Sequence, residues 1–244
     1  MQGSPGKALD YFVEGGKLII KPGFRRFILI PLLINIIIFV AITAALFNAF
    51  GDFFNQILAW SPDWLDWLAW LLWPLVAFIF LVVYGYSFNL ITNFIAAPFF
   101  GLLAEKVETH LTGNTPPEEP WSLLIPRTLQ RELVKLWYFV SRGLLVLILL
   151  GFCLFIPGLN LIAAIVAALW GCWSMVVQYA DYPADNHQLG FRELRRRLNS
   201  QPLTSYSYGA IILLGSMVPV LNIVVTPIAV AGATIYWIKE VRHL

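Results

Sequence analysis

The sequence predicts an all-α integral membrane protein, with two long transmembrane helices, two re-entrant (hemi-penetrating) helical hairpins and short amphipathic interfacial helices. Two observations predict this class. Hydrophobic residues make up 59% of the 244 residues and charged residues only 12%, whereas a soluble domain carries about 25% charged residues. In addition, four charge-free stretches each exceed the roughly 20 residues that span a bilayer core. They are Phe27–Gly51, Trp67–Ala104, Gly143–Ala180 and Leu198–Ile238.

We interpret the chain as a single membrane domain, 1–244. Its first segment, 1–21, is amphipathic, because apolar and charged residues alternate there with the period of a helix. A later segment, 190–199, is rich in arginine. The expected elements are an interfacial helix at 1–21, transmembrane helices at 23–51 and 64–106, a helix with the first hairpin at 121–180, a basic interfacial helix at 190–199 and the second hairpin at 204–240.

The basic residues predict the topology. The loop Asp52–Asp66 contains three aspartates and no Lys or Arg. Cytoplasmic segments of membrane proteins are enriched in Lys and Arg, so this loop is expected in the periplasm. The basic regions then share the other side, which predicts a multi-pass protein with both termini in the cytoplasm.

The two hairpins are expected from a repeated pattern. Leu149-Leu150-Gly151 precedes Pro157-Gly158-Leu159-Asn160, and Leu213-Leu214-Gly215 precedes Pro219-Val220-Leu221-Asn222. Proline and asparagine favour turns, so each P-x-L-N is a predicted hairpin tip. The apolar arms before the tips, Gly143–Ile156 and Tyr206–Val218, would reach only about 20 Å at 1.5 Å per residue. This length favours re-entrant hairpins, and two ordinary spanning hairpins are the alternative.

Polar residues inside or beside the apolar stretches suggest a pathway. Five asparagines lie within apolar segments, where such groups either bridge helices or line a path: Asn35, Asn89, Asn93, Asn160 and Asn222. Arg127, Arg131 and Lys135 form a basic stripe at i, i+4 and i+8. The stripe is interpreted either as a contact with anionic lipid headgroups or as an anion vestibule. We also expect Glu105 and Glu108 to form ion pairs with Arg127 or Arg131 at an inner mouth.

The segment Gly23-Phe24-Arg25-Arg26 is the strongest candidate for binding chemistry. It lies at the start of the first predicted spanning helix, where unpaired backbone N–H groups and a partial positive charge suit tetrahedral oxyanions. Guanidinium groups can bind oxyanion edges in bidentate fashion, and glycine allows close approach to the backbone. Such arginine pairs also serve simply as topology anchors, so the residues alone leave both interpretations open.

Other classes of protein are disfavoured. The chain has no H-E-x-x-H, G-x-S-x-G or P-loop pattern, so we expect neither an enzyme nor a cofactor. Asp181, Asp185 and His187 could in principle bind metal, but capping or interfacial bonding is the simpler explanation, and no metal site is expected. Cys153 and Cys172 are interpreted as buried hydrophobic residues. The net charge of +2 does not suggest a nucleic-acid partner.

Three longer segments of the chain are distinctive: PGFRRFILIPLLIN (Pro22–Asn35), NFIAAPFFGLLAEKVE (Asn93–Glu108) and QYADYPADNHQLGFRELR (Gln178–Arg195). Through them, and along nearly its whole length, the chain resembles the CysZ family of sulfate permeases. The paired P-x-L-N patterns fit as well. It is the order and spacing of these segments together that supports the resemblance.

The resemblance implies a function and a site. In that family a glycine-hydrophobic-arginine-arginine loop binds sulfate, which corresponds here to Gly23, Phe24, Arg25 and Arg26; family members usually have Leu in place of Phe24. The implied activity is uptake of sulfate, or of sulfite and related oxyanions, across the bacterial inner membrane for cysteine biosynthesis. A homo-oligomer embedded in the lipid bilayer is also implied. The alternative is a non-transporting membrane scaffold or assembly protein.

Overall fold

A computed structural model shows how the chain folds. It describes residues 3–27, 29–30, 32–34, 36–44, 74, 78, 81, 84, 94–117, 119–154, 156 and 159–244. The chain divides into two compact units, Leu29–Ala96 and the pair of segments Met1–Ile28 and Ala97–Leu244. Within the described residues all regular elements are helical, which confirms the all-α class.

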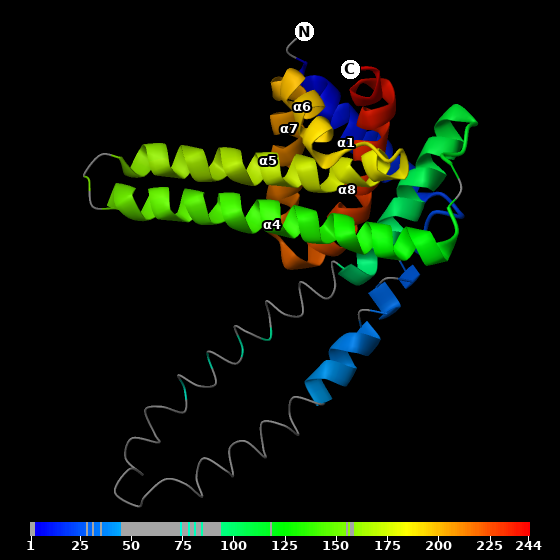
Figure 1. Cartoon of the computed structure of the whole chain (residues 1–244), viewed down its shortest axis with the longest axis horizontal. Coiled ribbons are helices and arrows are strands. Elements are labelled where there is room, and N and C mark those ends of the chain that lie inside the picture. Colours follow the sequence, from blue (N-terminus) through cyan, green and yellow to red (C-terminus); the bar gives the residue numbers. More distant parts are fainter. Residues whose placement is uncertain are drawn as a thin grey trace, which may run out of the picture. The chain divides into compact units, whose positions relative to one another are not determined.

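The larger unit, Met1–Ile28 with Ala97–Leu244, contains most of the described helices (Figure 1). Its elements are α1 (Pro5–Ile20), α4 (Trp121–Leu154), α5 (Asn160–Asn186), α6 (Phe191–Ser200), α7 (Pro202–Ser216), α8 (Pro219–Lys239) and the short 3-10 helix η2 (Val241–His243). A further helix covers residues 94–112. Of this helix, residues 97–112 belong to the larger unit.

Among the described residues of this unit, three helices are long and apolar enough to cross a membrane. They cover Trp121–Cys153, Asn160–Asn186 and Leu221–His243. In the apolar parts of the first two, few residues are buried in the structure. Exposed apolar surface of this extent requires lipid or protein around it, as expected for an integral membrane protein.

Helix α4 differs from the sequence-based expectation. The first hairpin arm was expected to begin at Gly143, but α4 runs without a break through 34 residues from Trp121, a length of about 51 Å. The next helix, α5, has 27 residues and lies beside α4 (Figure 1). The sequence has no proline between Arg127 and Ile156, so the charged segment and the apolar arm can form one helix. The short-arm argument for re-entry therefore does not hold for this hairpin, and its depth stays a prediction.

The second hairpin has a tighter turn than expected. Helix α7 has 15 residues, about 22 Å, and only Met217 and Val218 separate its end from α8. Pro219 is at the start of α8, so the P-x-L-N pattern forms the first turn of the helix and not the tip itself. Proline suits this position because its missing N–H would have no partner there.

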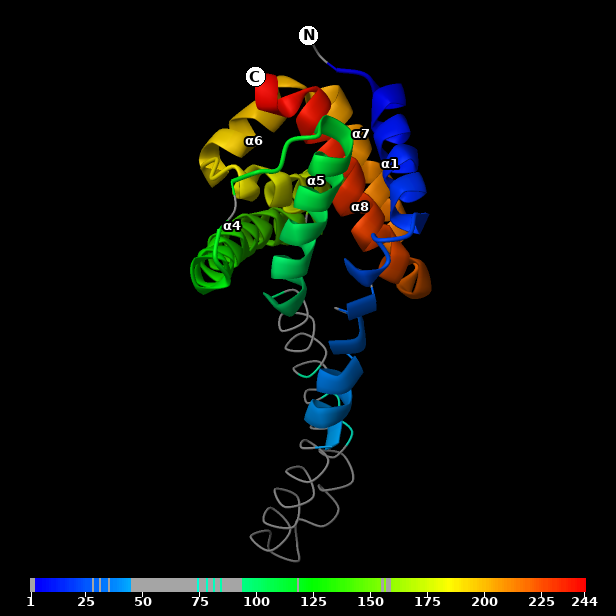
Figure 2. The same ribbon diagram turned by 90° about the vertical axis from the view of Figure 1, so that its right-hand side faces the viewer.

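Helix α1 packs against α7 and α8, beside which it lies in Figure 2. Its buried side consists of Ala8, Tyr11, Gly15, Leu18 and Ile19. Ion pairs of 2.8 Å between Lys7 and Glu240 and of 2.7 Å between Lys239 and Glu14 flank this contact. The amphipathic segment predicted at 1–21 therefore exists as a helix, and much of its apolar surface serves protein packing.

Helices α5 and α7 approach so closely that only glycine fits at position 209. A Cβ on Gly209 would overlap the carbonyl oxygen of Cys172. We expect Gly209→Ala to push α5 and α7 apart and to lower the free energy of unfolding by about 1–3 kcal/mol, seen as a lower melting temperature in detergent. Gly151→Ala is the matched control, because a Cβ there meets nothing within 4 Å. Equal melting temperatures for the two variants would contradict the close contact.

The smaller unit, Leu29–Ala96, is described only in part. Its described segments include helical residues at 36–44. In this unit the hydroxyl groups of Thr43 and Tyr84 lie 2.6 Å apart, and the rings of Phe39 and Tyr84 have centroids 6.0 Å apart. Of the transmembrane helices predicted at 23–51 and 64–106, residues 45–51 and most of 64–93 lie outside the described residues.

Candidate anion-binding site

A four-residue turn connects α1 to the helical segment that begins at Arg26. The Phe24 amide donates a hydrogen bond of 3.3 Å to the carbonyl of Lys21 and thereby closes the turn. Pro22 occupies its second position, and Gly23 occupies its third with φ of +95°. Proline followed by a positive-φ glycine is the pattern of a type II turn. The local sequence Lys-Pro-Gly-Phe therefore determines the shape of the segment that was predicted as the anion site.

The side chains of the turn point in different directions. Phe24 is only 4% exposed, whereas Gly23, Arg25 and Arg26 are exposed. The Arg25 Nε donates to the carbonyl of Ile20 at 3.1 Å. This bond to the last residue of α1 orients the guanidinium, and it leaves both of its terminal NH₂ groups for other acceptors.

Positive charge at the turn is not neutralised by carboxylates of the described residues. Neither Arg25 nor Arg26 forms an ion pair with any of the described residues. The Arg26 guanidinium lies 5.0 Å from the Phe27 ring centroid. Within the same part of the chain, the amides of Gly23 and Arg25 donate to no backbone carbonyl. Exposed guanidinium groups beside open amides are the donors that an oxyanion needs.

The positive φ of Gly23 provides a direct test of the turn. A Cβ at this position would meet nothing within 4 Å, so a substitution acts through backbone conformation and not through a clash. A left-handed conformation costs an L-residue roughly 1–2 kcal/mol. We expect Gly23→Ala to weaken oxyanion binding severalfold with little change in melting temperature, as measured by equilibrium binding to purified protein. Wild-type affinity in this variant would show that the turn conformation is not needed.

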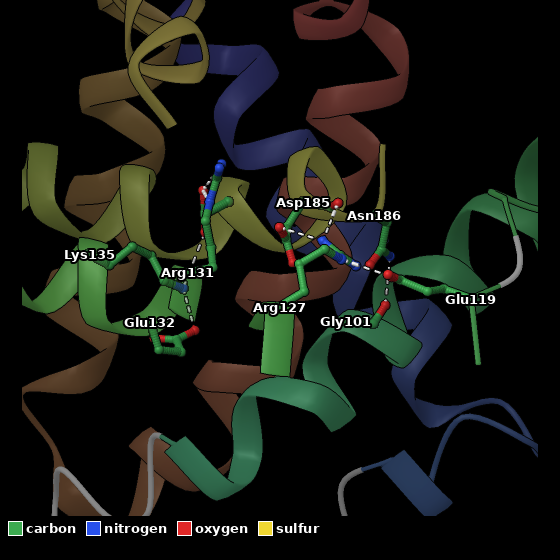
Figure 3. A network of polar contacts seen from close by, with 9 residues as sticks. Gly101, Glu119, Arg127, Arg131, Glu132, Lys135, Asp185 and Asn186 are labelled. Carbon is green, nitrogen blue, oxygen red and sulfur yellow. Dashed lines mark hydrogen bonds and ion pairs between the residues drawn. The ribbon is translucent and has the colours of Figure 1, made fainter. Parts of the chain in front are cut away.

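The basic stripe of α4 is engaged in ion pairs (Figure 3). Arg127 contacts Glu119 at 2.8 Å and Asp185 at 2.6 Å, and Arg131 contacts Asp181 at 2.7 Å. Both arginines thus bind carboxylates of the protein, chiefly those at the end of α5.

Lys135, the last residue of the stripe, is only 1% exposed. Its Nζ lies 2.5 Å from Glu132 and 3.4 Å from Asp181, although the angles are not those of hydrogen bonds. The ammonium also lies 4.4 Å from the Tyr182 ring centroid. With the two arginines, Lys135 completes a cluster whose three cations face the four carboxylates of Glu119, Glu132, Asp181 and Asp185. The stripe therefore has no excess positive charge with which to form an anion vestibule.

The predicted pairing of Glu108 with Arg127 or Arg131 needs correction. Glu108, 3% exposed, has its carboxylate 2.9 Å from His187 Nε2 and 3.4 Å from an Arg242 terminal nitrogen, and not beside Arg127 or Arg131. Glu105 and Arg127 both line a small pocket. The acidic residues at the end of α5 lie closer to the arginines than Glu108 does, because antiparallel packing brings that end of α5 to the beginning of α4.

Comparison with known proteins identifies the family. The family model described as "Sulfate transporter CysZ/Etoposide-induced protein 2.4" matches residues 11–227. A curated relative from Pseudomonas aeruginosa named "Sulfate transporter CysZ" is 42% identical over 235 residues, which are 95% of this chain and 94% of the relative. A protein of the same name from Pectobacterium atrosepticum is 41% identical over 240 residues, 97% of this chain and 86% of the relative. The chain belongs to the CysZ/EI24 family.

For this CysZ-family chain, the predicted pathway asparagines are only partly described. Asn160 is the first residue of α5, and Asn222 lies in the first turn of α8; both are exposed. The Asn222 side chain accepts a hydrogen bond of 3.3 Å from Thr226. No hydrogen bond joins Asn160 to Asn222 among the described residues, and Asn35, Asn89 and Asn93 lie outside them.

Sequence reasoning did not identify Asp181 and Asp185 as the partners of the basic stripe. The sequence contained a signal for this pairing, because Arg127 and Arg131 lie four positions apart and so do Asp181 and Asp185. Two antiparallel helices with opposite charges at this spacing can form two ion pairs at once. These aspartates were instead ascribed to capping or interfacial bonding. Among the described residues no group of His, Cys, Asp and Glu could hold a metal ion.

Proposed function

We propose that this chain carries sulfate across the bacterial inner membrane, with the turn Gly23–Arg26 as the site that receives the anion. The observation that carries the site is the turn itself: a positive-φ glycine, open amides and two arginines without carboxylate partners among the described residues. The sulfate substrate is supported by the name of the curated relatives, which align with 95–97% of this chain.

The chemistry of sulfate fits the turn. Sulfate is a tetrahedral dianion that accepts hydrogen bonds on every oxygen and is costly to remove from water. Backbone amides and guanidinium groups replace that water with charge-assisted hydrogen bonds. Because Arg25 and Arg26 are exposed, they can exchange the anion with the aqueous phase, as a transporter requires. By contrast, the ion-paired arginines of α4 have their donors occupied by carboxylates.

The orientation and the assembly of the protein belong to the same proposal. The basic side of the protein, which includes both termini, faces the cytoplasm, where the imported sulfate supplies cysteine biosynthesis. The exposed apolar surfaces of α4 and α5 contact lipid and further copies of the chain in a homo-oligomer. The ion pairs of Arg127 and Arg131 with acidic residues near the end of α5 shape the inner end of the path. Glu105, which lines a pocket with Arg127, and Glu108, which pairs with His187 and Arg242, lie on the neighbouring helix. The asparagines at 35, 89, 93, 160 and 222 contribute polar groups along the path.

Sulfate flux into vesicles tests the proposed function. Purified protein reconstituted into liposomes should admit radiolabelled sulfate faster than protein-free liposomes, and unlabelled sulfate or sulfite should compete. The Gly23→Ala protein links the flux to the turn, because it should fold and insert but show reduced flux. Flux equal to that of protein-free liposomes, from protein shown to be folded, would favour the non-transporting scaffold.

A further inference from the structure

His110 contacts both ends of the turn that contains the candidate anion site. Its ring packs edge-to-face against Phe24, with centroids 5.7 Å apart and an interplanar angle of 80°. Its Nε2 lies 3.4 Å from the Nζ of Lys21. Lys21 and Phe24 are the first and last residues of the turn and are joined by its closing hydrogen bond. One imidazole therefore contacts the turn at both of the residues that define its opening.

The chemistry of the Lys21 contact specifies the role of the imidazole. A lysine ammonium only donates hydrogen bonds, so His110 Nε2 must accept through its lone pair, which requires the neutral ring with the proton on Nδ1. The imidazole therefore orients the ammonium without neutralising its charge. A carboxylate at the same place would pair with Lys21 and would repel an approaching oxyanion.

The helix that carries His110 is itself fixed to α5 along its length. The Phe100 ring packs against Tyr182 at 5.5 Å, Asn186 donates to the carbonyl of Gly101 at 2.8 Å, and Glu108 contacts His187 at 2.9 Å. His110 follows Glu108 by only two residues. The helix thus holds the imidazole in place, and the turn packs against it through Lys21 and Phe24.

We propose that His110 is a positioning residue of the anion site, which holds Lys21 and Phe24 so that the open amides and arginines of the turn face the anion. This inference rests on the proposed function of the turn. His110 is assigned no contact with the anion, so it acts through Lys21 and Phe24. Because the side chain is exposed, its loss should affect the turn much more than the stability of the helices.

Sulfate affinity of the full-length protein tests the role of His110. We expect His110→Ala to weaken equilibrium sulfate binding about fivefold, the effect of one ordinary hydrogen bond, with an unchanged melting temperature. His110→Gln keeps an acceptor for Lys21 and His110→Phe keeps a ring against Phe24, so each should recover part of the affinity. Lys106→Ala, an exposed position one turn earlier on the same helix, is the matched control and should bind as wild type.

A double-mutant comparison tests the coupling to Lys21. If the nitrogen of His110 acts through Lys21, the losses from Lys21→Met and His110→Phe should combine to less than the product of the two separate effects. Fully independent effects, or a failure of both Gln and Phe to recover any affinity, would overturn the inference.

The arginine variants separate this inference from the proposed function. Loss of sulfate binding in Arg25→Ala/Arg26→Ala, with wild-type affinity in His110→Ala, would refute the role of His110 and leave the anion site in place. Wild-type affinity in both would refute the anion site and the role of His110 with it.

Discussion

Removal of both turn arginines is expected to abolish most sulfate binding without unfolding the protein. Each charge-assisted contact contributes roughly 1.5–3 kcal/mol, which corresponds to about ten- to a hundredfold in affinity. Arg25 and Arg26 are exposed and form no ion pair with the described residues, so their loss leaves no buried carboxylate unpaired. Equilibrium sulfate binding to Arg25→Ala/Arg26→Ala, together with its melting temperature in detergent, measures both parts of the expectation.

The matched control for this double variant is Arg192→Ala/Arg196→Ala on α6. These arginines are also exposed, so the control removes the same net charge from another surface. It should retain sulfate affinity if the turn geometry, and not the overall charge, binds the anion. Equal losses in the two double variants would point to a general electrostatic effect, and unchanged binding in the turn variant would remove the site assignment.

Asp181→Ala is expected to be among the most destabilising single substitutions in the α4–α5 hairpin. Asp181 is 1% exposed and contacts both Arg131 and Lys135. Removal of one partner from a buried ion pair costs about 3–5 kcal/mol, because the remaining charge is left without compensation. Thermal unfolding in detergent should show a large fall in melting temperature.

Two further variants make this test specific. Glu193→Ala removes a carboxylate that pairs with Arg196 and Arg197 at the surface, where ion pairs contribute about 0–1 kcal/mol, so its effect should be small. Arg131→Leu/Asp181→Leu removes both charges together and should recover part of the stability, because replacement of a whole pair is far less costly than its disruption. A melting temperature near wild type for Asp181→Ala would contradict the buried cluster.

These two predictions assign different roles to the two groups of arginines. At the turn, the guanidinium groups are exposed and lack carboxylate partners among the described residues. On α4 they face at least as many carboxylates as there are cations. The sequence predicts the α4 stripe as a contact with lipid headgroups or as an anion vestibule, with ion pairs from Arg127 or Arg131 to Glu105 and Glu108. In the structure the charges of the stripe hold the beginning of α4 against the end of α5.

Several features followed from the sequence because they depend on neighbouring residues or on composition. The helical class follows from long charge-free stretches, in which a backbone in lipid must satisfy its own hydrogen bonds. The helices predicted at 1–21 and 190–199 exist as α1 (Pro5–Ile20) and α6 (Phe191–Ser200). The turn before Arg26 follows from Pro22 and Gly23, whose φ preferences act locally.

Only the tertiary structure decided which charges pair and where long helices end. Arg131 and Asp181 are 50 residues apart in the chain, and their contact exists because α4 and α5 pack antiparallel. The charged segment and the apolar arm also continue as one helix through Gly143, where the charge pattern alone suggested a boundary. His110 likewise reaches the turn only through the packing of its helix on α5. Composition and local conformation are encoded residue by residue, whereas ion pairs between distant segments depend on how the helices come together.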